Sequence, residues 1–300
     1  MLKILPLFII LSHFLFGQEF IEERRIGGEE ADVKFNNPRA IAIAQDGLVY
    51  VVDTGNNVIH TFNNSGQLQR TYGGFGFRND QFDRPVDIWL RDLLNIYIAD
   101  YNNQRVQRYN RTMHFISSLT SDDSSPAEFQ FLEVGGCALN SQNDLFVLDG
   151  GENKIIKFNR RGQPERSFGG YESGEGQLQE PAQMDIVNNK YLVVTDRNRK
   201  ALIIFDFFGN FINCISMPDF KSPAGIAVDN ERIFIADPIA KKIFIVATDF
   251  SKVTAVKLKL TQPVRQPVDL AIAKQKDKNN KFQRLYLIDG GQLIIGRLTH

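Results

Sequence analysis

One short pattern recurs along the chain and limits what the chain can fold into. A run of alternating apolar residues ends in an aspartate, a small polar turn follows, and a second alternating run begins. Residues 50–67, YVVDTGNNVIHTFNNSGQ, are the clearest copy. The aspartate recurs at intervals of 41 to 52 residues, at Asp53, Asp100, Asp149, Asp196, Asp237 and Asp289. Repetition at this spacing indicates a chain built from similar units, so no copy can be interpreted alone.

Each unit contains four short alternating segments and no helical periodicity. In the first unit, one segment precedes the aspartate run (PRAIAIA, 38–44), one follows it (NVIHTFN, 57–63), and a less regular fourth leads to a Gly-rich linker. Units of this kind are the blades of a β-propeller. We therefore predict an all-β fold, a single six-bladed β-propeller with four-stranded antiparallel blades.

The last unit ends after its third segment, at QLIIGRLTH (292–300), whereas the segment EFIEERRIGG (19–28) precedes the first unit. We expect the N-terminal segment to supply the missing fourth strand. The two ends of the chain would then pair in one blade and close the ring, which also removes exposed sheet edges.

The repeats resemble a known family. PRAIAIAQDGLVYVVDTGNNVIHTF (38–62) is similar to the NHL repeat, and residues 84–109 and 222–246 are weaker copies. The resemblance covers about Ile21 to His300 and implies the fold more specifically than the function. A WD-repeat propeller fits less well, because the only tryptophan is Trp89 and no Trp-Asp pair ends a strand.

The first residues predict an export signal. MLKILPLFIILSHFLFG has one lysine, an apolar run and a small residue before a cleavage point, so we assign 1–17 to a signal peptide and 18–300 to the propeller. An uncleaved anchor is the alternative, although the run is short for a bilayer. We expect a periplasmic or extracellular protein. Cys137 and Cys214 have different local settings and are expected to be two separate, buried thiols.

Repeated residues are best explained by the fold. Six catalytic aspartates around a ring make no chemical sense, whereas a carboxylate at a strand end can accept hydrogen bonds from turn N–H groups. The recurring aromatic residues are predicted to pack between blades; they are Phe62, Tyr109, Phe158 and Phe205. Function should lie where the units differ.

The third residue of the first segment differs between units. In chain order it is Ala40, Asp87, Gly136, Gln183, Gly225 and Asp269. This position should line the central channel, and Asp87, Gln183 and Asp269 fall on alternate blades. Converging oxygen atoms suit Ca²⁺, although six or more oxygens are usual. The alternative is a channel lined by polar side chains without metal. No other cofactor is expected.

An enzyme would use the same rim. Six-bladed lactonases and related hydrolases resemble this architecture and hold a metal on the axis. The sequence argues against a zinc site built from histidines, because His60, His114 and His300 are not expected to converge. No nucleophile elbow, phosphate loop or Cys-pair motif is present, and we assign no catalytic residue.

The turns that follow the recurring aspartates carry cations on two neighbouring units. They are Arg197, Arg199, Lys200, Lys241 and Lys242. Some NHL propellers bind RNA through a basic face, but export and the balance of 35 basic and 35 acidic residues argue against RNA here. An acidic protein, an anionic glycan or an envelope lipid head group is the expected ligand; an ordinary solvated surface is the alternative.

These observations favour an exported binding scaffold. Its partner protein or anionic glycan-type ligand would lie on the face that carries the channel rim and the turns after the aspartates. The alternative function is a calcium-dependent hydrolase or lactonase-like enzyme with its site at the central channel.

Overall fold

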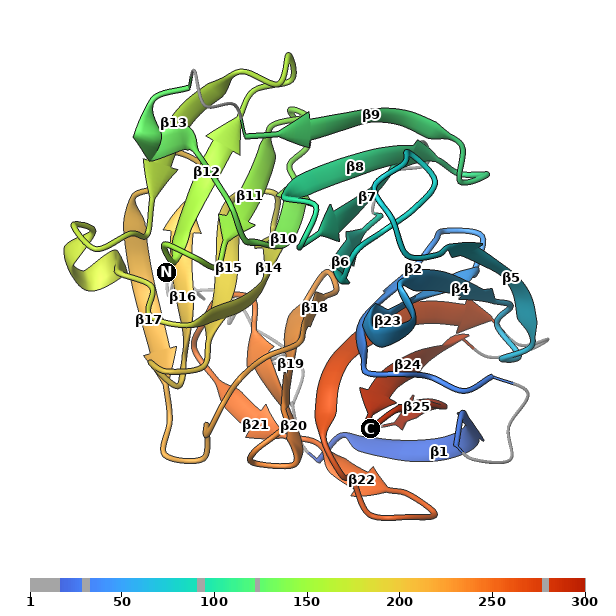
Figure 1. Cartoon of the computed structure of the whole chain (residues 1–300). Coiled ribbons are helices and arrows are strands. Elements are labelled where there is room, and N and C mark those ends of the chain that lie inside the picture. The colour runs from blue at the N-terminus through green and yellow to red at the C-terminus, as the bar shows by residue number, and fades with distance from the viewer. Residues whose placement is uncertain (1–16, 29–32, 91–94, 122–124, 277–280, 300) are drawn as a thin grey trace, which may run out of the picture.

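The computed structural model of the chain describes residues 17–28, 33–90, 95–121, 125–276 and 281–299. Within these residues, strands form six sheets around a central axis, as Figure 1 shows. The predicted six-bladed, all-β propeller is therefore confirmed. The predicted signal peptide, apart from Gly17, lies outside the described residues. No helix among the described residues is long and apolar enough to cross a membrane.

The strands follow one another from the axis outwards in five of the blades. Blade 1 contains β2 (Pro38–Ile43), β3 (Val49–Asp53), β4 (Val58–Phe62) and β5 (Leu68–Gly73). Blade 2 contains β6 (Pro85–Trp89), β7 (Asn95–Asp100), β8 (Arg105–Asn110) and β9 (Phe115–Thr120). Blade 3 contains β10 (Val134–Leu139), β11 (Leu145–Asp149), β12 (Lys154–Phe158) and β13 (Pro164–Phe168).

The remaining blades are less uniform. Blade 4 contains β14 (Pro181–Val187), β15 (Tyr191–Asp196), β16 (Ala201–Asp206) and β17 (Phe211–Ser216). Blade 5 contains β18 (Ile226–Val228), β19 (Arg232–Asp237), β20 (Lys242–Ala247) and β21 (Val253–Ala255). Blade 6 contains β23 (Pro267–Lys276), β24 (Lys281–Asp289), β25 (Gln292–Thr299), β1 (Glu19–Ile26) and β22 (Lys257–Lys259). Three single-turn 3₁₀ helices, η1 to η3, lie in turns and linkers: Thr54–Asn56, Ala127–Phe129 and Gly174–Gly176.

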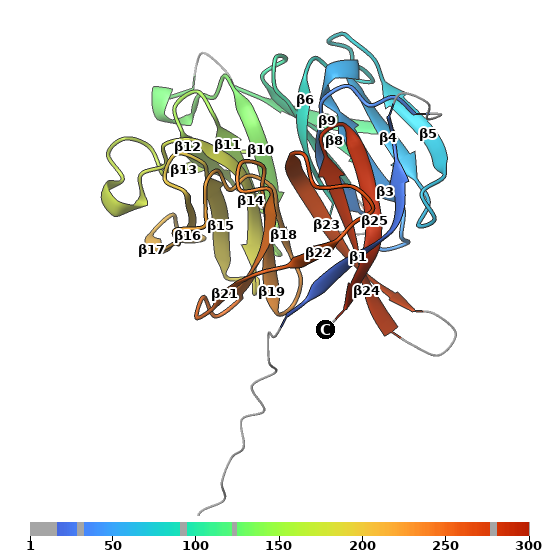
Figure 2. The same ribbon diagram turned by 90° about the horizontal axis from the view of Figure 1, so that it is seen from below.

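The two ends of the chain close the ring as predicted. Strand β1 pairs antiparallel with β25, from Glu19 opposite Thr299 to Ile26 opposite Leu293. Figure 2 shows β1 beside β25 in this last blade. Phe20 is fully buried in the core between blades 5 and 6. The N-terminal strand therefore contributes backbone hydrogen bonds and apolar packing to closure.

Blade 6 also has a fifth strand that the four-strand repeat did not predict. After the short β21, the chain leaves blade 5 and β22 runs parallel to β1, with Leu258 opposite Phe20. The side chains of Lys257 and Lys259 both form ion pairs with Glu19. Strand β1 is thus hydrogen-bonded on both of its edges.

The recurring aromatic residues pack in the interior as predicted. Phe62, Tyr109, Phe158 and Phe205 are each at most 4% exposed. Phe62, on blade 1, belongs to a core cluster that includes Tyr286 and Leu293 of blade 6. The repeated position therefore supplies the hydrophobic contact between neighbouring blades.

The closing strand gives a direct test. Replacing Phe20 with alanine removes a fully buried ring, and a change of this kind typically costs about 3–5 kcal/mol of unfolding free energy. Replacing Ile21, which is 37% exposed on the same strand, should cost far less. Urea denaturation of both variants measures the difference, and deletion of residues 18–28 should destabilise the whole ring. A deletion variant that keeps the wild-type melting temperature would contradict this role.

Candidate functional site at the channel

The recurring aspartates are buried structural residues, as predicted. Each accepts hydrogen bonds from backbone N–H groups of the linker that enters the innermost strand of its own blade. Asp53, for example, accepts from Asn36, and Asp196 accepts from Gln179. The corresponding donors in the other blades are Asp83 to Asp100, Glu133 to Asp149, Lys221 to Asp237 and Arg265 to Asp289. The aspartate therefore fixes the linker to the strand end, and its recurrence requires no catalysis.

A bulge follows the first residue of the innermost strand in blades 1, 2, 3, 4 and 6. In blade 1, Pro38 lies opposite Asp53 but Ala40 lies opposite Val52, so Arg39 is the additional residue. The same shift precedes the third residue in the other four blades. Bulges redirect side chains. Here the shift presents the second and third residues of the strand to the channel.

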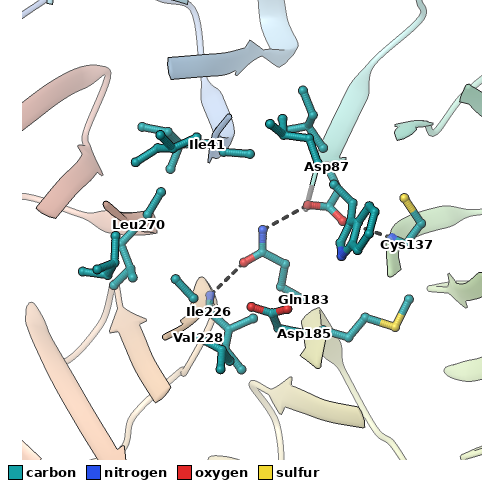
Figure 3. A pocket seen from close by; sticks show the side chains of 17 residues that line it. Ile41, Asp87, Cys137, Gln183, Asp185, Ile226, Val228 and Leu270 are labelled. Atoms are coloured by element: carbon teal, nitrogen blue, oxygen red, sulfur yellow. Dashed lines mark hydrogen bonds between the residues drawn. The ribbon is translucent and has the colours of Figure 1, made fainter. Parts of the chain in front are cut away.

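Three of the predicted channel residues meet on the axis. The side-chain amide nitrogen of Gln183 donates to Asp87 Oδ1 and to Asp269 Oδ2, both at 3.1 Å. Gln183 Oε1 in turn accepts from the backbone N–H of Ile226 at 2.8 Å, which fixes the orientation of the amide. Figure 3 shows Gln183 between Asp87 and Ile226. The three side chains form one hydrogen-bonded group across the channel, which we call the axial triad.

Each member of the axial triad also holds the next blade. Asp87 on blade 2 accepts from Cys137 N–H on blade 3 at 3.0 Å, and Asp269 on blade 6 accepts from Ile41 N–H on blade 1 at 2.8 Å. Gln183 makes the matching contact from blade 4 to blade 5. The triad therefore links three pairs of blades through the innermost backbone.

The small residues on the other blades make this geometry possible. A Cβ atom added at Gly136 would lie 2.9 Å from Asp87 Oδ2. One added at Gly225 would lie 2.4 Å from the Asp269 Cα. The alternation of small and polar residues in the sequence thus reflects close approach between blades at the axis.

Burial governs the titration of the two carboxyl groups. Burial raises the pKa of Asp87, although hydrogen bonds from Cys137, Gln183 and Ile88 act in the opposite direction. Burial also raises the pKa of Asp269 well above its ordinary value, and the charge of Asp87 adds to this effect. Because the carboxyl groups of Asp87 and Asp269 both bind the amide nitrogen of Gln183, they lie close together, and ionising both costs more than ionising one.

The predicted calcium ligands are already engaged. Both oxygens of Asp87, both oxygens of Asp269 and the amide oxygen of Gln183 accept hydrogen bonds. Among the described residues, no group of three His, Cys, Asp or Glu side chains is placed to hold a metal ion. Calcium at the axial triad would compete with the donors that these oxygens already bind.

A second cluster lies above the triad, on the face that carries the linkers and the turns after the aspartates. We call this the rim face. A cavity of about 50 Å³ there is lined by Arg39, Arg197 and Gln183, together with the second residues of four other innermost strands, namely Val86, Gly135, Ala182 and Ala224. Burial lowers the pKa of Arg39, and the charges of Arg197 and Arg84 lower it further. Arg39 and Arg197 therefore line the channel mouth together, and Arg84 is close enough for its charge to act on Arg39.

The predicted basic residues differ in how far they are engaged. Arg199 donates to the backbone carbonyls of Glu175 and Gln177, and Lys242 forms an ion pair with Asp219. Lys200 and Lys241 occupy left-handed turn positions with exposed side chains. Arg197 lies 3.7 Å from Glu180 and is the only one of the five among the described lining residues of the mouth cavity.

Sequence reasoning missed Arg39 and Arg84. A signal for Arg39 was present, because it is the one charged residue among the second positions of the innermost strands. The strand pairing within blade 1 could not have revealed the role of Arg39, because the cavity forms only where several blades meet. Asp185, a buried carboxyl group that lines the channel below the triad, was also not identified.

The histidines do not form a cluster within the described residues. His60 is buried in blade 1, where Nε2 lies 3.3 Å from Asp53 Oδ2 and Nδ1 lies 2.8 Å from Thr71 Oγ1. His114 contacts Thr112 in an exposed turn. His300 lies outside the described residues.

Both cysteines are free, as expected, and they lie in different blades. Cys137 is buried on β10, where burial raises the pKa of its thiol. Cys214, on the outer strand β17, is half-exposed, so its predicted burial was wrong. An outermost strand has no neighbouring strand on one edge, which leaves this position partly open.

The buried carboxyl groups predict a pH dependence of stability. An unfolded aspartate titrates near pH 3.9. Because the folded pKa of Asp269 is raised, its contribution to stability is present below about pH 3.9 and is lost as the pH rises through the folded pKa. As the pH rises from about 3.9, the free energy of unfolding of Asp269→Asn should therefore fall less than that of the wild type. Urea denaturation at several pH values measures this difference.

A control of opposite sign is available. The pKa of Asp249 is lowered by hydrogen bonds from Ser251, so Asp249→Asn removes a contribution that is lost as the pH falls. A constant offset between the wild type and Asp269→Asn at every pH would contradict the assignment.

Comparison with known proteins agrees with this architecture. The family model for the NHL repeat matches residues 35–62, which lie in blade 1 and the linker before it. Protein brain tumor of Drosophila melanogaster is 31% identical over 121 residues, which is 39% of this chain but only 12% of the fly protein. The chain thus spans about an eighth of the length of this relative.

Among solved structures, a streptogramin B lyase has a TM-score of 0.63 at 12% identity and covers 94% of this chain and 97% of its own. A virginiamycin B lyase from Staphylococcus aureus has a TM-score of 0.60 at 13% identity, with 94% and 99% coverage. At these identities the similarity shows the fold alone. The repeat match, the fly relative and the closed ring of blades together show that the chain is similar to six-bladed NHL-repeat β-propellers.

Proposed function

We propose that this propeller binds an acidic segment of a partner protein on its rim face, outside the cytoplasm. The observation that carries the proposal is Arg39. Its side chain is half-buried at the channel mouth, and it has no hydrogen bond or ion pair within the described residues. An arginine held in this way, in one cavity with Arg197, favours a carboxylate, which can accept two parallel hydrogen bonds from it.

Exposed apolar side chains also lie on the rim face. Phe75 and Phe77 are 71% and 80% exposed, and both lie on the linker between blades 1 and 2. Leu132 and Tyr171 lie on later linkers, and Ile239 lies on the turn after Asp237; each is at least 60% exposed. All five belong to the rim face, since linkers and these turns share one end of the blades.

This composition favours a protein partner over an anionic glycan. Binding energy at protein interfaces is concentrated in aromatic residues and arginine. A sulfated or carboxylated glycan would use the arginines but leave the apolar side chains in water. A segment with acidic residues next to apolar ones would satisfy both sets, and the exposed Lys200 and Lys241 would extend its electrostatic attraction.

The proposed location rests on the sequence of residues 1–17, which lie almost wholly outside the described residues. Export would place the rim face among envelope or extracellular proteins. Mass measurement of the N-terminus after expression with its native leader checks this part separately, since cleavage near Gln18 is expected.

Binding to the rim face can be tested with a random 12-residue peptide library displayed on phage and selected on residues 18–300. Selected peptides should be enriched in Asp and Glu next to apolar residues. Arg39→Ala should weaken the best peptide at least about tenfold, which corresponds to about 1.4 kcal/mol. Arg70→Ala removes an exposed arginine from an outer strand and should leave affinity unchanged.

Two outcomes would overturn the proposal. Peptides whose affinity is insensitive to both Arg39→Ala and Phe77→Ala would show that the rim face is not the site. Heparin binding that is lost in Arg39→Ala, with no selectable peptide, would assign the face to an anionic glycan instead.

A calcium-dependent hydrolase at the axis is the second candidate, because Asp87 and Asp269 do converge there with Gln183. If the axial triad binds Ca²⁺, added calcium should raise the melting temperature by mass action, and Asp87→Ala should abolish the rise. Under the scaffold proposal, calcium and EDTA give the same melting temperature in both proteins.

A further inference from the structure

A separate cavity lies on the face opposite the rim face, which we call the far face. It has a volume of about 590 Å³ and is walled by the turns that join the first and second strands of blades 3, 4 and 5. Pockets for small ligands commonly measure about 300–1,000 Å³. Neither the axial triad nor Arg39 contributes to this far-face groove.

The walls of the groove are rich in uncharged polar side chains. The amides of Asn143 and Asn230 and the hydroxyl of Ser141 have no hydrogen-bond partner within the described residues. Asn189 accepts from Ser141 N–H through its oxygen, which leaves its amide nitrogen available. The turns therefore present both donors and acceptors to the groove.

Backbone conformation explains only part of this composition. Asn143, Asn188 and Asn189 have positive φ angles, which asparagine tolerates better than most residues. Asn230 does not have a positive φ angle. Turn geometry also gives no reason for the free amides to gather around one cavity.

The floor of the groove is apolar and includes one unsatisfied donor. It is formed by Trp89, Leu139, Ile186 and Val228. Trp89 is only 8% exposed, and its indole N–H is buried with no acceptor in the described part of the chain. A buried donor of this kind is costly unless a ligand or water supplies the acceptor.

The groove favours a neutral ligand. Its one ionisable lining residue among those described is Asp229, whose charge is already neutralised. Burial acts to raise the pKa of Asp229, but hydrogen bonds from Arg232 and Glu231 bring it below its usual value. Oδ2 of Asp229 also accepts from Gln283. The groove therefore offers neither a free cation for an anion nor a free carboxylate for a cation.

The backbone of the groove argues against an extended peptide. Peptides that add to a sheet need an unpaired strand edge. Here the wall consists of tight turns rather than a strand edge, and several of their N–H groups are already paired, such as Asn143 to Asn140 and Asp229 to Arg232. Recognition must come from side chains, and amides match hydroxyl groups because both donate and accept.

We propose that the far-face groove binds a neutral saccharide of one or two sugar units. The hydroxyl groups would pair with the amides and Ser141, and the apolar face of the ring would lie over the floor next to Trp89. This site is independent of the rim face, so the failure of one proposal leaves the other intact.

Trp89 is the only tryptophan in the chain, so its fluorescence reports directly on the groove. Glucose, galactose, N-acetylglucosamine, maltose and lactose are titrated into residues 18–300. At least one should change the emission saturably in the millimolar range or below. The double variant Ser141→Ala, Asn230→Ala should weaken this binding at least about tenfold. Asn64→Ala, at an exposed turn of blade 1 outside the groove, should not.

Three results would overturn the proposal. One is the absence of a saturable response to every sugar. Another is a response that the double variant leaves unchanged. The third is saturable binding of the uncharged peptide N-acetyl-triglycine amide without binding of any sugar, which would assign the groove to peptides. Circular dichroism of the double variant confirms that it remains folded, since both substituted side chains are exposed.

Discussion

The ring depends on the pairing between β1 and β25. Every other blade is a continuous stretch of chain, so its strands meet through short turns, but blade 6 joins segments more than 260 residues apart in sequence. Closing so long a loop is entropically costly, and the cost must be met by the contacts made on closure. Backbone hydrogen bonds on both edges of β1 and the burial of Phe20 supply them. Without this pairing, blade 6 would expose an edge and the inner strands would lose their fixed distances.

The channel uses that fixed geometry. Hydrogen bonds of about 3 Å across the axis require the innermost strands to be held to within fractions of an ångström, which only a closed ring provides. The axial triad separates the cavity at the channel mouth from the channel below. Arg39 lies above it, where no carboxylate among the described residues forms an ion pair with its guanidinium group. The functional proposal for the rim face therefore follows from where the fold places its charges.

Much of the fold could be predicted because the signal is repeated. Six copies of one pattern identify the strands, the blade boundaries and the structural role of Asp53, even where one copy such as the segment before Ile226 is weak. The convergence of Asp87, Gln183 and Asp269 also follows from their equivalent positions. Strand β22 was not predicted, because Lys257–Lys259 alternates like a strand but no other unit has a strand at this place.

The unforeseen parts of the sites share one physical cause. The mouth cavity and the far-face groove are made by residues from several blades, so their composition is not local in sequence. From the sequence alone, Arg39 is a solvent-exposed strand residue. Only the fold shows that it lines one cavity with Arg197. The engagement of Arg199 by linker carbonyls likewise depends on how a linker folds back, which periodicity does not specify.

The alternation at the axis has a consequence for how such a ring can change. Blades 2, 4 and 6 carry the polar residue and blades 1, 3 and 5 the small one, so the repeating structural unit at the axis is a pair of blades. Loss or gain of a single blade would bring two polar or two small residues together, leaving a collision or an unsatisfied N–H. Exchange of whole pairs would preserve this alternation. Although the sequence repeats six times, the axis of the ring is built from three pairs of blades.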